Sequence, residues 1–207
     1  MKLHYFAASL IALDHGAVYV DSSADPGNIG DLAVRTAAGM FRELGTQYEV
    51  RVHGSGATAL TRLRVREGRV SLGREDGPVI ASAGEQLTVR GNALARQPIA
   101  VYGPDWDWVL STAPMLEIEG VKVRRFLDWV AREAGWQVKI ADKETASVAE
   151  SVVLHGSIRH LTLAEAPGVV LASCGLGHRT SDGTMLVFVA GKEKATAARS
   201  RAASRPR

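Results

Sequence analysis

Apolar and polar residues alternate along most of the first half of the chain, and this alternation constrains the fold more than any other feature. Residues 48–52 read YEVRV, residues 61–66 read TRLRVR, and Val70 and Leu72 continue the pattern. A period of two is typical of half-buried strands, because successive side chains of a strand point to opposite faces. Turn signals such as Asp76-Gly77 recur at short spacing. The pattern predicts a mostly antiparallel β domain over residues 1–92, a sandwich or a short solenoid, without helices.

The N-terminal residues MKLHYFAASLIAL only loosely imitate a signal peptide. The apolar run is short, is interrupted by His4, and is not followed by a small-x-small cleavage site. We therefore expect a strand over residues 9–13, a turn at 14–16 and a second strand over 17–21.

The positive charge of the chain is concentrated at its C-terminus. The formal net charge is +3, with a pI of about 9.2. Residues 191–207 hold six lysines and arginines against one glutamate, which is +5 and leaves −2 for the other 190 residues. With almost no large apolar residue, this tail is predicted to be disordered. We predict no nucleic-acid partner, and interpret the arginines of residues 62–66 as the solvent face of a hairpin because no stacking aromatic separates them.

A break rich in glycine and proline spans residues 93–113 and contains Trp106 and Trp108. On an extended segment, side chains two positions apart point the same way. We expect this pair to pin a linker onto a domain or to fill the seam between two domains. The alternative interpretation is an aromatic platform for a ligand such as a sugar.

The apolar period changes to that of a helix after Pro114. Val123, Phe126, Leu127 and Val130 share one face of an amphipathic helix, and Gly135 stands where a left-handed cap is expected. The whole of residues 114–190 is predicted to be a small α+β domain. Its further elements are short strands at 115–118, 136–140 and 152–154, a polar stretch over 142–150, a helix opened by a Thr162–Glu165 capping box, and a hairpin of 176–180 with 184–189. Pro167 predicts either a kink in the second helix or a helix that begins only near this residue.

Residues that could support catalysis are few. Cys174 is the single cysteine, and the six histidines lack the i, i+4 spacing of a helical metal pair. Asp14, Asp21 and Asp25 fall around turns, where aspartate bonds to the backbone, with a calcium site as the alternative interpretation. We therefore predict no enzyme, no cofactor and no metal site. The enzyme alternative would use Cys174 or the histidines.

Five short motifs in order resemble the FecR family of bacterial cell-surface signalling regulators. Residues 16–22 resemble its "GAVYVDS" strand and residues 32–39 its "VRTPAG" segment, with Ala37 where proline is common. Residues 43–50, 65–70 and 83–87 resemble "LGTQFEV", "VREGRV" and "AGEQL". Residues 117–136 and 154–166 look like the C-terminal part of the same family, which is similar to the short N-terminal domain of secretins and TonB-dependent receptors. Pro167 departs from that pattern.

The resemblance implies a non-enzymatic periplasmic module, tethered to the inner membrane in the family, that controls a sigma factor. Its C-terminal domain is expected to bind the signalling domain of a TonB-dependent outer-membrane receptor by adding a strand at an exposed edge. The candidate edge residues are Val152, Val153, Leu154, Thr184, Leu186 and Phe188.

The cytoplasmic and transmembrane parts of the family are absent here, and Met1 falls inside the β domain. We therefore expect a fragment, a mis-set start or a degenerate copy, with any sigma-factor contact made through the missing part. The competing hypothesis is a cell-wall or glycan-binding module that uses Trp106 and Trp108.

Overall fold

The computed structural model describes residues 9–22, 32–43, 45–56, 59–112 and 115–191. The predicted tail, residues 191–207, lies outside the described residues except for Gly191. The chain divides into two compact units, residues 1–101 and 102–207. The first unit runs past residue 92, where the sequence pattern ended it, because residues 93–98 pair with the preceding strand along their whole length. Those six residues were wrongly predicted to belong to a linker.

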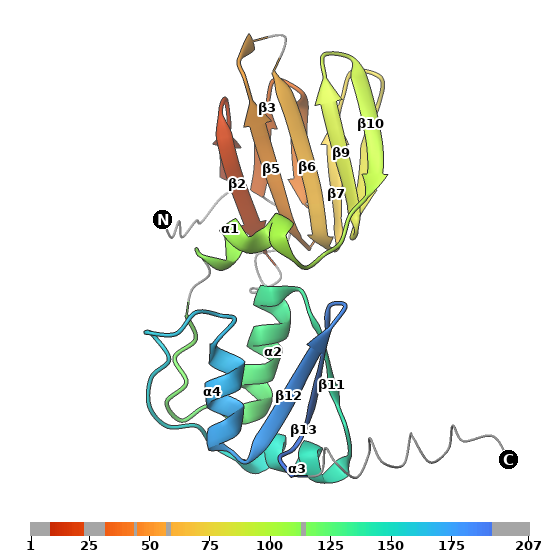
Figure 1. Cartoon of the computed structure of the whole chain (residues 1–207). Helices are drawn as coiled ribbons and strands as arrows, with labels where there is room; N and C mark the ends of the chain where they lie inside the picture. Colours follow the sequence, from red (N-terminus) through yellow and green to blue (C-terminus); the bar gives the residue numbers. More distant parts are fainter. Residues whose placement is uncertain (1–8, 23–31, 44, 57–58, 113–114, 192–207) are drawn as a thin grey trace, which may run out of the picture. The chain divides into compact units, whose positions relative to one another are not determined.

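The described residues of the first unit form ten strands, drawn from red to yellow-green in Figure 1. They are β1 (Ser9–Ala12), β2 (Gly16–Asp21), β3 (Leu32–Thr36), β4 (Gly39–Glu43), β5 (Gln47–His53), β6 (Leu60–Glu67), β7 (Arg69–Gly73), β8 (Val79–Ser82), β9 (Glu85–Arg90) and β10 (Ala93–Pro98). One sheet has the order β1-β3-β4-β7-β8 and the other β10-β9-β6-β5-β2. All pairs are antiparallel except β1 with β3.

The core of the first unit lies between the two sheets, so the sandwich alternative is the one observed. Phe41 and Leu72 come from one sheet, Val50, Leu63 and Leu87 come from the other, and all five are fully buried. Val50, Leu63 and Leu72 are apolar positions of the sequence alternation. Burying a side chain of this kind stabilises a fold by about 1.5–3 kcal/mol.

Gly68 carries the chain from one sheet to the other. β6 and β7 adjoin it in sequence but belong to different sheets, and β6 forms its hairpin with β5. Gly68 has φ of +74°, and a Cβ there would collide with the carbonyl oxygen of Gly45. A residue with a side chain could adopt neither this conformation nor this close approach without strain.

The arginines of β6 point away from the core, but two of them are not solvated as predicted. Arg64 is 8% and Arg66 4% exposed. Arg64 donates from Nε to Oε1 of Gln86 at 2.8 Å, and Arg66 donates from Nε to the carbonyl oxygen of Val101 at 2.9 Å. The two guanidinium groups lie along the surface of the sheet because Gln86 and the Val101 carbonyl accept hydrogen bonds from them there.

Glu49 holds together the outward face of this sheet, which we call the charged face (Glu49, Arg51, Arg62, Arg64 and Gln86). Its side chain is fully buried, and it accepts from Arg51 Nη2 at 3.2 Å and from Arg62 Nη2 at 2.9 Å. Burial alone would raise the pKa of Glu49, but the hydrogen bonds and charges of the two arginines outweigh burial and lower it. Arg51 and Arg62 lie directly opposite each other, an arrangement of like charges that costs stability without a shared counter-ion.

The second unit combines short helices with a three-stranded sheet (Figure 1). Its elements are the 3-10 helix η3 (Pro104–Trp106), α1 (Asp107–Leu110), α2 (Val123–Ala134), β11 (Gln137–Ile140), α3 (Lys143–Ser151), α4 (Ala166–Ser173), β12 (Leu176–Ser181) and β13 (Thr184–Val189). The strand order is β11-β13-β12, with β11 parallel and β12 antiparallel to β13. The predicted α+β organisation is therefore present.

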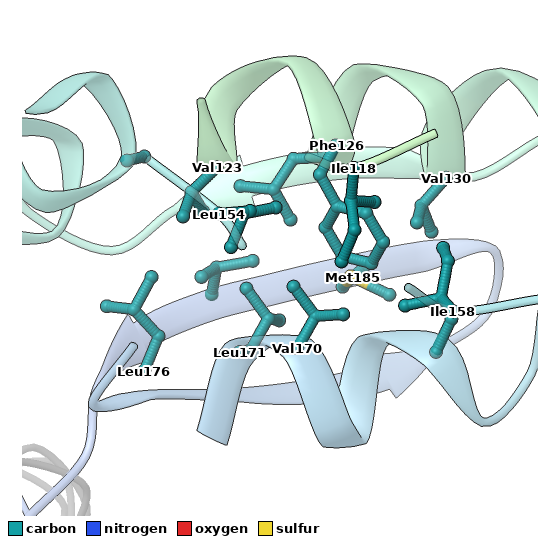
Figure 2. Packing of buried hydrophobic residues seen from close by; sticks show 14 of the residues in the cluster. Ile118, Val123, Phe126, Val130, Leu154, Ile158, Val170, Leu171, Leu176 and Met185 are labelled. Atoms are coloured by element: carbon teal, nitrogen blue, oxygen red, sulfur yellow. The ribbon is translucent and has the colours of Figure 1, made fainter. Parts of the chain in front are cut away.

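The core of this unit is formed by α2 and α4 together with one face of the sheet. Figure 2 shows Phe126 and Val130 of α2 and Val170 and Leu171 of α4 pointing toward one another, with Met185 of β13 among them. All of these side chains are at most 4% exposed. The helical period read from the sequence thus identifies the buried face of α2.

Local signals set the ends of α2 and α4 as predicted. Gly135 caps α2 in the left-handed conformation, with φ of +69°. α4 begins at Ala166 with Pro167 in its first turn, where a missing backbone N–H costs no helical hydrogen bond. Thr162 and Glu165 form the reciprocal capping-box bonds just before it.

Three predictions in this unit are wrong. Residues 142–150 form no plain polar stretch: α3 occupies 143–151, capped by Asp142, which accepts from the Thr145 amide at 2.8 Å. Residues 115–118 form no strand. Residues 152–154 form only an isolated bridge, between Val153 and Lys122. Within the described part of the chain, no helix is long and apolar enough to cross a bilayer.

Candidate partner-binding surface

β13 directs alternate side chains to opposite sides of the three-stranded sheet. Met185 and Val187 are fully buried in the core. Thr184, Leu186 and Phe188 therefore point to the side away from the core, and we call these three side chains the apolar face. Leu186 is 36% exposed, and the other two are half-buried. The structure thus brings together three of the residues nominated from the sequence.

The same residues do not lie on an edge of the sheet, contrary to the sequence-based prediction. β13 is the central strand, with its backbone bonded to β11 on one side and to β12 on the other. No further strand can be added beside a strand whose two edges are occupied. The edges of this sheet are β11 and β12, so binding at residues 184–189 would have to use side chains.

Two cationic residues flank Leu186. Lys139 of β11 and Arg179 of β12 are its register partners on either side, and both are exposed. Side chains paired in this way lie on the same face of a sheet. The exposed leucine therefore has a positive charge on each side, which favours a partner with an apolar centre and acidic surroundings.

Gly177 positions the ring of Phe188. The two residues are register partners, and a Cβ on Gly177 would lie 2.6 Å from Cε2 of Phe188. The ring thus rests on the bare backbone of β12. A flat aromatic side chain held against backbone is a rigid contact surface of low entropic cost.

The nominated residues 152–154 contribute little surface. Leu154 is 4% exposed and belongs to the core, and Val152 is half-buried. Only Val153, at 41% exposed, presents a large apolar surface. The backbone of this segment bonds to residues 120–123, with Val123 N–H donating to Val152 and Leu154 N–H donating to Val121. The segment is bound through its backbone to the residues at the start of α2 and lies outside the three-stranded sheet.

An ion-paired loop follows this segment. Glu119 accepts from the Gly156 amide at 2.7 Å and contacts Nδ1 of His155 at 2.8 Å. The Gly156 amide and then His155 lower the pKa of Glu119. Arg159 donates to Glu117 at 2.7 Å. These exposed contacts fasten residues 155–159 to residues 117–119.

Trp106 and Trp108 do not form a platform. Trp106 ends η3 and is fully buried, whereas Trp108 lies in α1 and is half-buried. The chain is helical here, so side chains two positions apart point in different directions. The extended segment predicted from glycine and proline content is wrong, and Trp106 has no exposed surface to offer a sugar.

The candidate residues for catalysis are scattered. Cys174 is half-buried, with its Sγ 3.7 Å from the Ser173 hydroxyl. Burial lowers the pKa of His178. No group of three or more histidine, cysteine, aspartate or glutamate side chains in the described residues could hold a metal ion. Asp25 of the calcium interpretation lies outside the described residues.

The sequence analysis did not identify Lys139 and Arg179 as candidate partner-binding residues. The alternation of residues 137–140, QVKI, could have placed Lys139 on the side of β11 opposite Val138. Which strand lies beside Leu186 could not be read, because strand order depends on contacts distant in sequence.

Comparisons with known proteins give few matches. No family model and no curated protein matches the chain. Two crystal structures, at 2.50 Å and 1.65 Å, of what is described as "a putative anti-sigma factor" from Parabacteroides distasonis are similar to it. Each has 14% sequence identity and a TM-score of 0.40, and the match covers 89% of this chain and 82% of the other. A likeness of this size supports no conclusion about fold or function.

Proposed function

We propose that this chain is the periplasmic sensory part of a FecR-type regulator, and that its second unit binds the signalling domain of a TonB-dependent outer-membrane receptor. Through this contact the regulator would control an extracytoplasmic-function sigma factor. The observation that carries the proposal is the apolar face: an exposed leucine that lies between two cationic residues, with an aromatic ring two residues further along the same strand, on a sheet whose other side is the core.

The FecR-like motifs support the family assignment through the way they fit together. Gly45 belongs to the "LGTQFEV"-like segment and Gly68 to the "VREGRV"-like segment. The two are in such close contact that Gly68 leaves no room for a side chain. A third motif joins them, because the amide of Gly84 donates to the carbonyl oxygen of Val65 at 3.0 Å. Motifs far apart in sequence are thus parts of one packed turn region.

The chemistry of the apolar face supports a protein partner. An exposed leucine beside a half-buried aromatic ring suits the centre of a protein–protein contact, where apolar area is removed from water. Lys139 and Arg179 would pair with acidic side chains at the rim of the partner. Because β13 is central, the receptor domain would dock over the sheet face, and would not add a strand beside residues 184–189.

The test measures binding of the signalling domain of a TonB-dependent receptor from the same organism to the purified protein by calorimetry. Leu186→Glu places a carboxylate in the centre of the face and should weaken binding by at least about tenfold, a loss of ~1.4 kcal/mol. Leu94→Glu is the matched control, because Leu94 is also 36% exposed but lies on β10 of the first unit. Equal affinities for both variants would contradict the proposal, as would no binding by the unaltered chain.

A further inference from the structure

We propose that the first unit carries a second site, a cleft for a small polar carboxylate, where three turns meet at one end of the sandwich. The cleft has a volume of about 620 Å³. It is lined by residues 37–39, 73–76 and 91–92, with Met40 and Arg42 of β4. Sites for small molecules usually enclose about 300–1,000 Å³. Turns at the end of a sandwich are a common place for them, because a rigid scaffold holds the turns in position.

Small residues and close backbone contacts keep the cleft open. Gly39, Gly73 and Gly91 send no side chain into it. β4 and β7 approach so closely here that a Cβ on Gly39 would collide with the carbonyl oxygen of Gly73. Arg74 donates from Nη2 to the carbonyl oxygen of Asn92 at 3.0 Å, which ties the turn after β7 to the turn after β9. The walls of the cleft are therefore fixed to one another.

The charges in the cleft define the ligand. Arg42 is exposed, and within the described residues its side chain makes no hydrogen bond or ion pair, so its guanidinium is available to a carboxylate in a two-bond fork. Glu75 and Asp76 are also exposed and can only accept hydrogen bonds while ionised. They repel a simple polyanion and favour a molecule with its own donors. The fitting chemistry is one carboxylate together with hydroxyl or ammonium groups, as in a sugar acid or an amino acid.

This site is independent of the proposed receptor contact, because the cleft belongs to the first unit and the apolar face to the second. An experiment that disproves the carboxylate site does not disprove the receptor contact, and the reverse also holds.

Two substitutions test the cleft, each with a matched control on the same face of the same sheet. Arg42→Gln removes the anchor charge, and Arg35→Gln removes an exposed arginine of β3 that does not line the cleft. Gly73→Val fills the cleft: Gly73 has no positive φ, and a Cβ there meets only ordinary contacts, the nearest at 3.6 Å. Ser71→Val makes a similar change two residues away on β7, outside the cleft.

The measurement is a titration of the full chain with sodium glucuronate, sodium glutamate and, as the neutral control, glucose, followed by amide NMR shifts. We expect one carboxylate to shift the amides of Gly39, Gly73 and Asn92, while glucose does not. Tighter binding of glucuronate identifies a sugar-acid site, and tighter binding of glutamate an amino-acid site. Arg42→Gln and Gly73→Val should each weaken binding by at least about tenfold, the size of one lost charge-assisted hydrogen bond, and the two controls should not.

Three results overturn the site: no shift of these amides by either carboxylate, equal shifts by glucose, or an Arg42→Gln variant that binds like the unaltered chain. The exposed Arg42 position decides the question even if Gly73→Val fails to fold.

Discussion

The charged face of the first unit and the apolar face of the second unit are both sheet surfaces turned away from a core, yet they differ in chemistry. On the charged face, Glu49 accepts from two arginines and Gln86 accepts from a third. On the apolar face, Leu186 remains exposed between Lys139 and Arg179. The first surface pairs its charged groups with one another, whereas the second leaves apolar area that only another molecule can cover. An interaction surface is thus better recognised by what it leaves unsatisfied than by its charge.

The comparison predicts the largest loss of stability at the centre of the charged face. Glu49→Ala removes the carboxylate that two opposed arginines share and should lower the free energy of unfolding by about 3 kcal/mol, as when one partner of a buried pair is removed. Glu85→Ala is the control, because its pair with Arg96 at 2.8 Å is exposed and should be worth at most about 1 kcal/mol. Urea denaturation measures both, and equal losses would show that the charged face is not a coupled network.

A middle-sized effect is expected where the apolar face rests on backbone. Gly177→Ala pushes the ring of Phe188 out of its place and should cost about 1 kcal/mol of unfolding free energy. Receptor binding should fall as well, because the ring is part of the contact. Gly73→Ala is the control without a clash and should not destabilise. An unchanged stability for Gly177→Ala would mean that Phe188 is not held by β12.

The pH dependence of stability sharpens the comparison further, because the charged face contains a carboxylate. The pKa of Glu49 is lower in the folded state, so its contribution is present above the ordinary value of 4.5 and is lost as the pH falls through the folded pKa. Glu49→Gln should remove this part of the loss of stability at low pH. Thermal unfolding from pH 7 to pH 3 measures it, and parallel curves for the two proteins would contradict the prediction.

The contribution of Glu43 to stability should change with pH in the opposite direction to that of Glu49. It is 3% exposed, and burial is the main reason that its pKa is raised, with Asp21 adding to the effect. A raised folded pKa favours folding below the ordinary value of 4.5, and this contribution falls as the pH rises through the raised pKa. Glu43→Gln should therefore flatten the stability curve above pH 4.5, and thermal unfolding at pH 5 and pH 7 measures the difference. A steeper curve would show that Glu43 is ionised and paired.

The smallest effect should come from the exposed leucine itself. Leu186→Ser removes apolar area that water already reaches and should change stability by about 0.5 kcal/mol or less. Val187→Ala, at the next position, removes fully buried methyl groups and should cost about 2 kcal/mol. Urea denaturation of the two variants compares how much the exposed and the buried side of β13 contribute to the free energy of unfolding. A large loss for Leu186→Ser would place it in the core.

Predictions from local patterns were the ones that held. Alternation located β2, β5, β6 and β7, and the helical period identified the buried face of α2 with Phe126 and Val130. The hairpin predicted over residues 176–180 and 184–189 is present as β12 and β13. The Asp142 cap of α3 is equally local, but the polar composition that follows it hid the helix.

Predictions that required knowledge of distant neighbours failed. β13 was taken for an edge because nothing in residues 184–189 reveals that β11, more than 40 residues earlier, pairs along its other side. Arg64 and Arg66 were taken for solvated groups because their acceptors, Gln86 and Val101, come from later parts of the chain. Trp106 was placed on an extended segment, since a single turn of helix leaves almost no periodic signal.

The central position of β13 also bears on how the protein is made. It is the last strand within the described residues and the one to which both β11 and β12 are bonded. During synthesis, β11 and β12 therefore have no partner in their own sheet until residues 184–189 have emerged. All ten strands of the first unit precede this point. The N-terminal unit can complete its sheets while the second half is still being translated, and a chain cut before Thr184 would lose the whole C-terminal sheet.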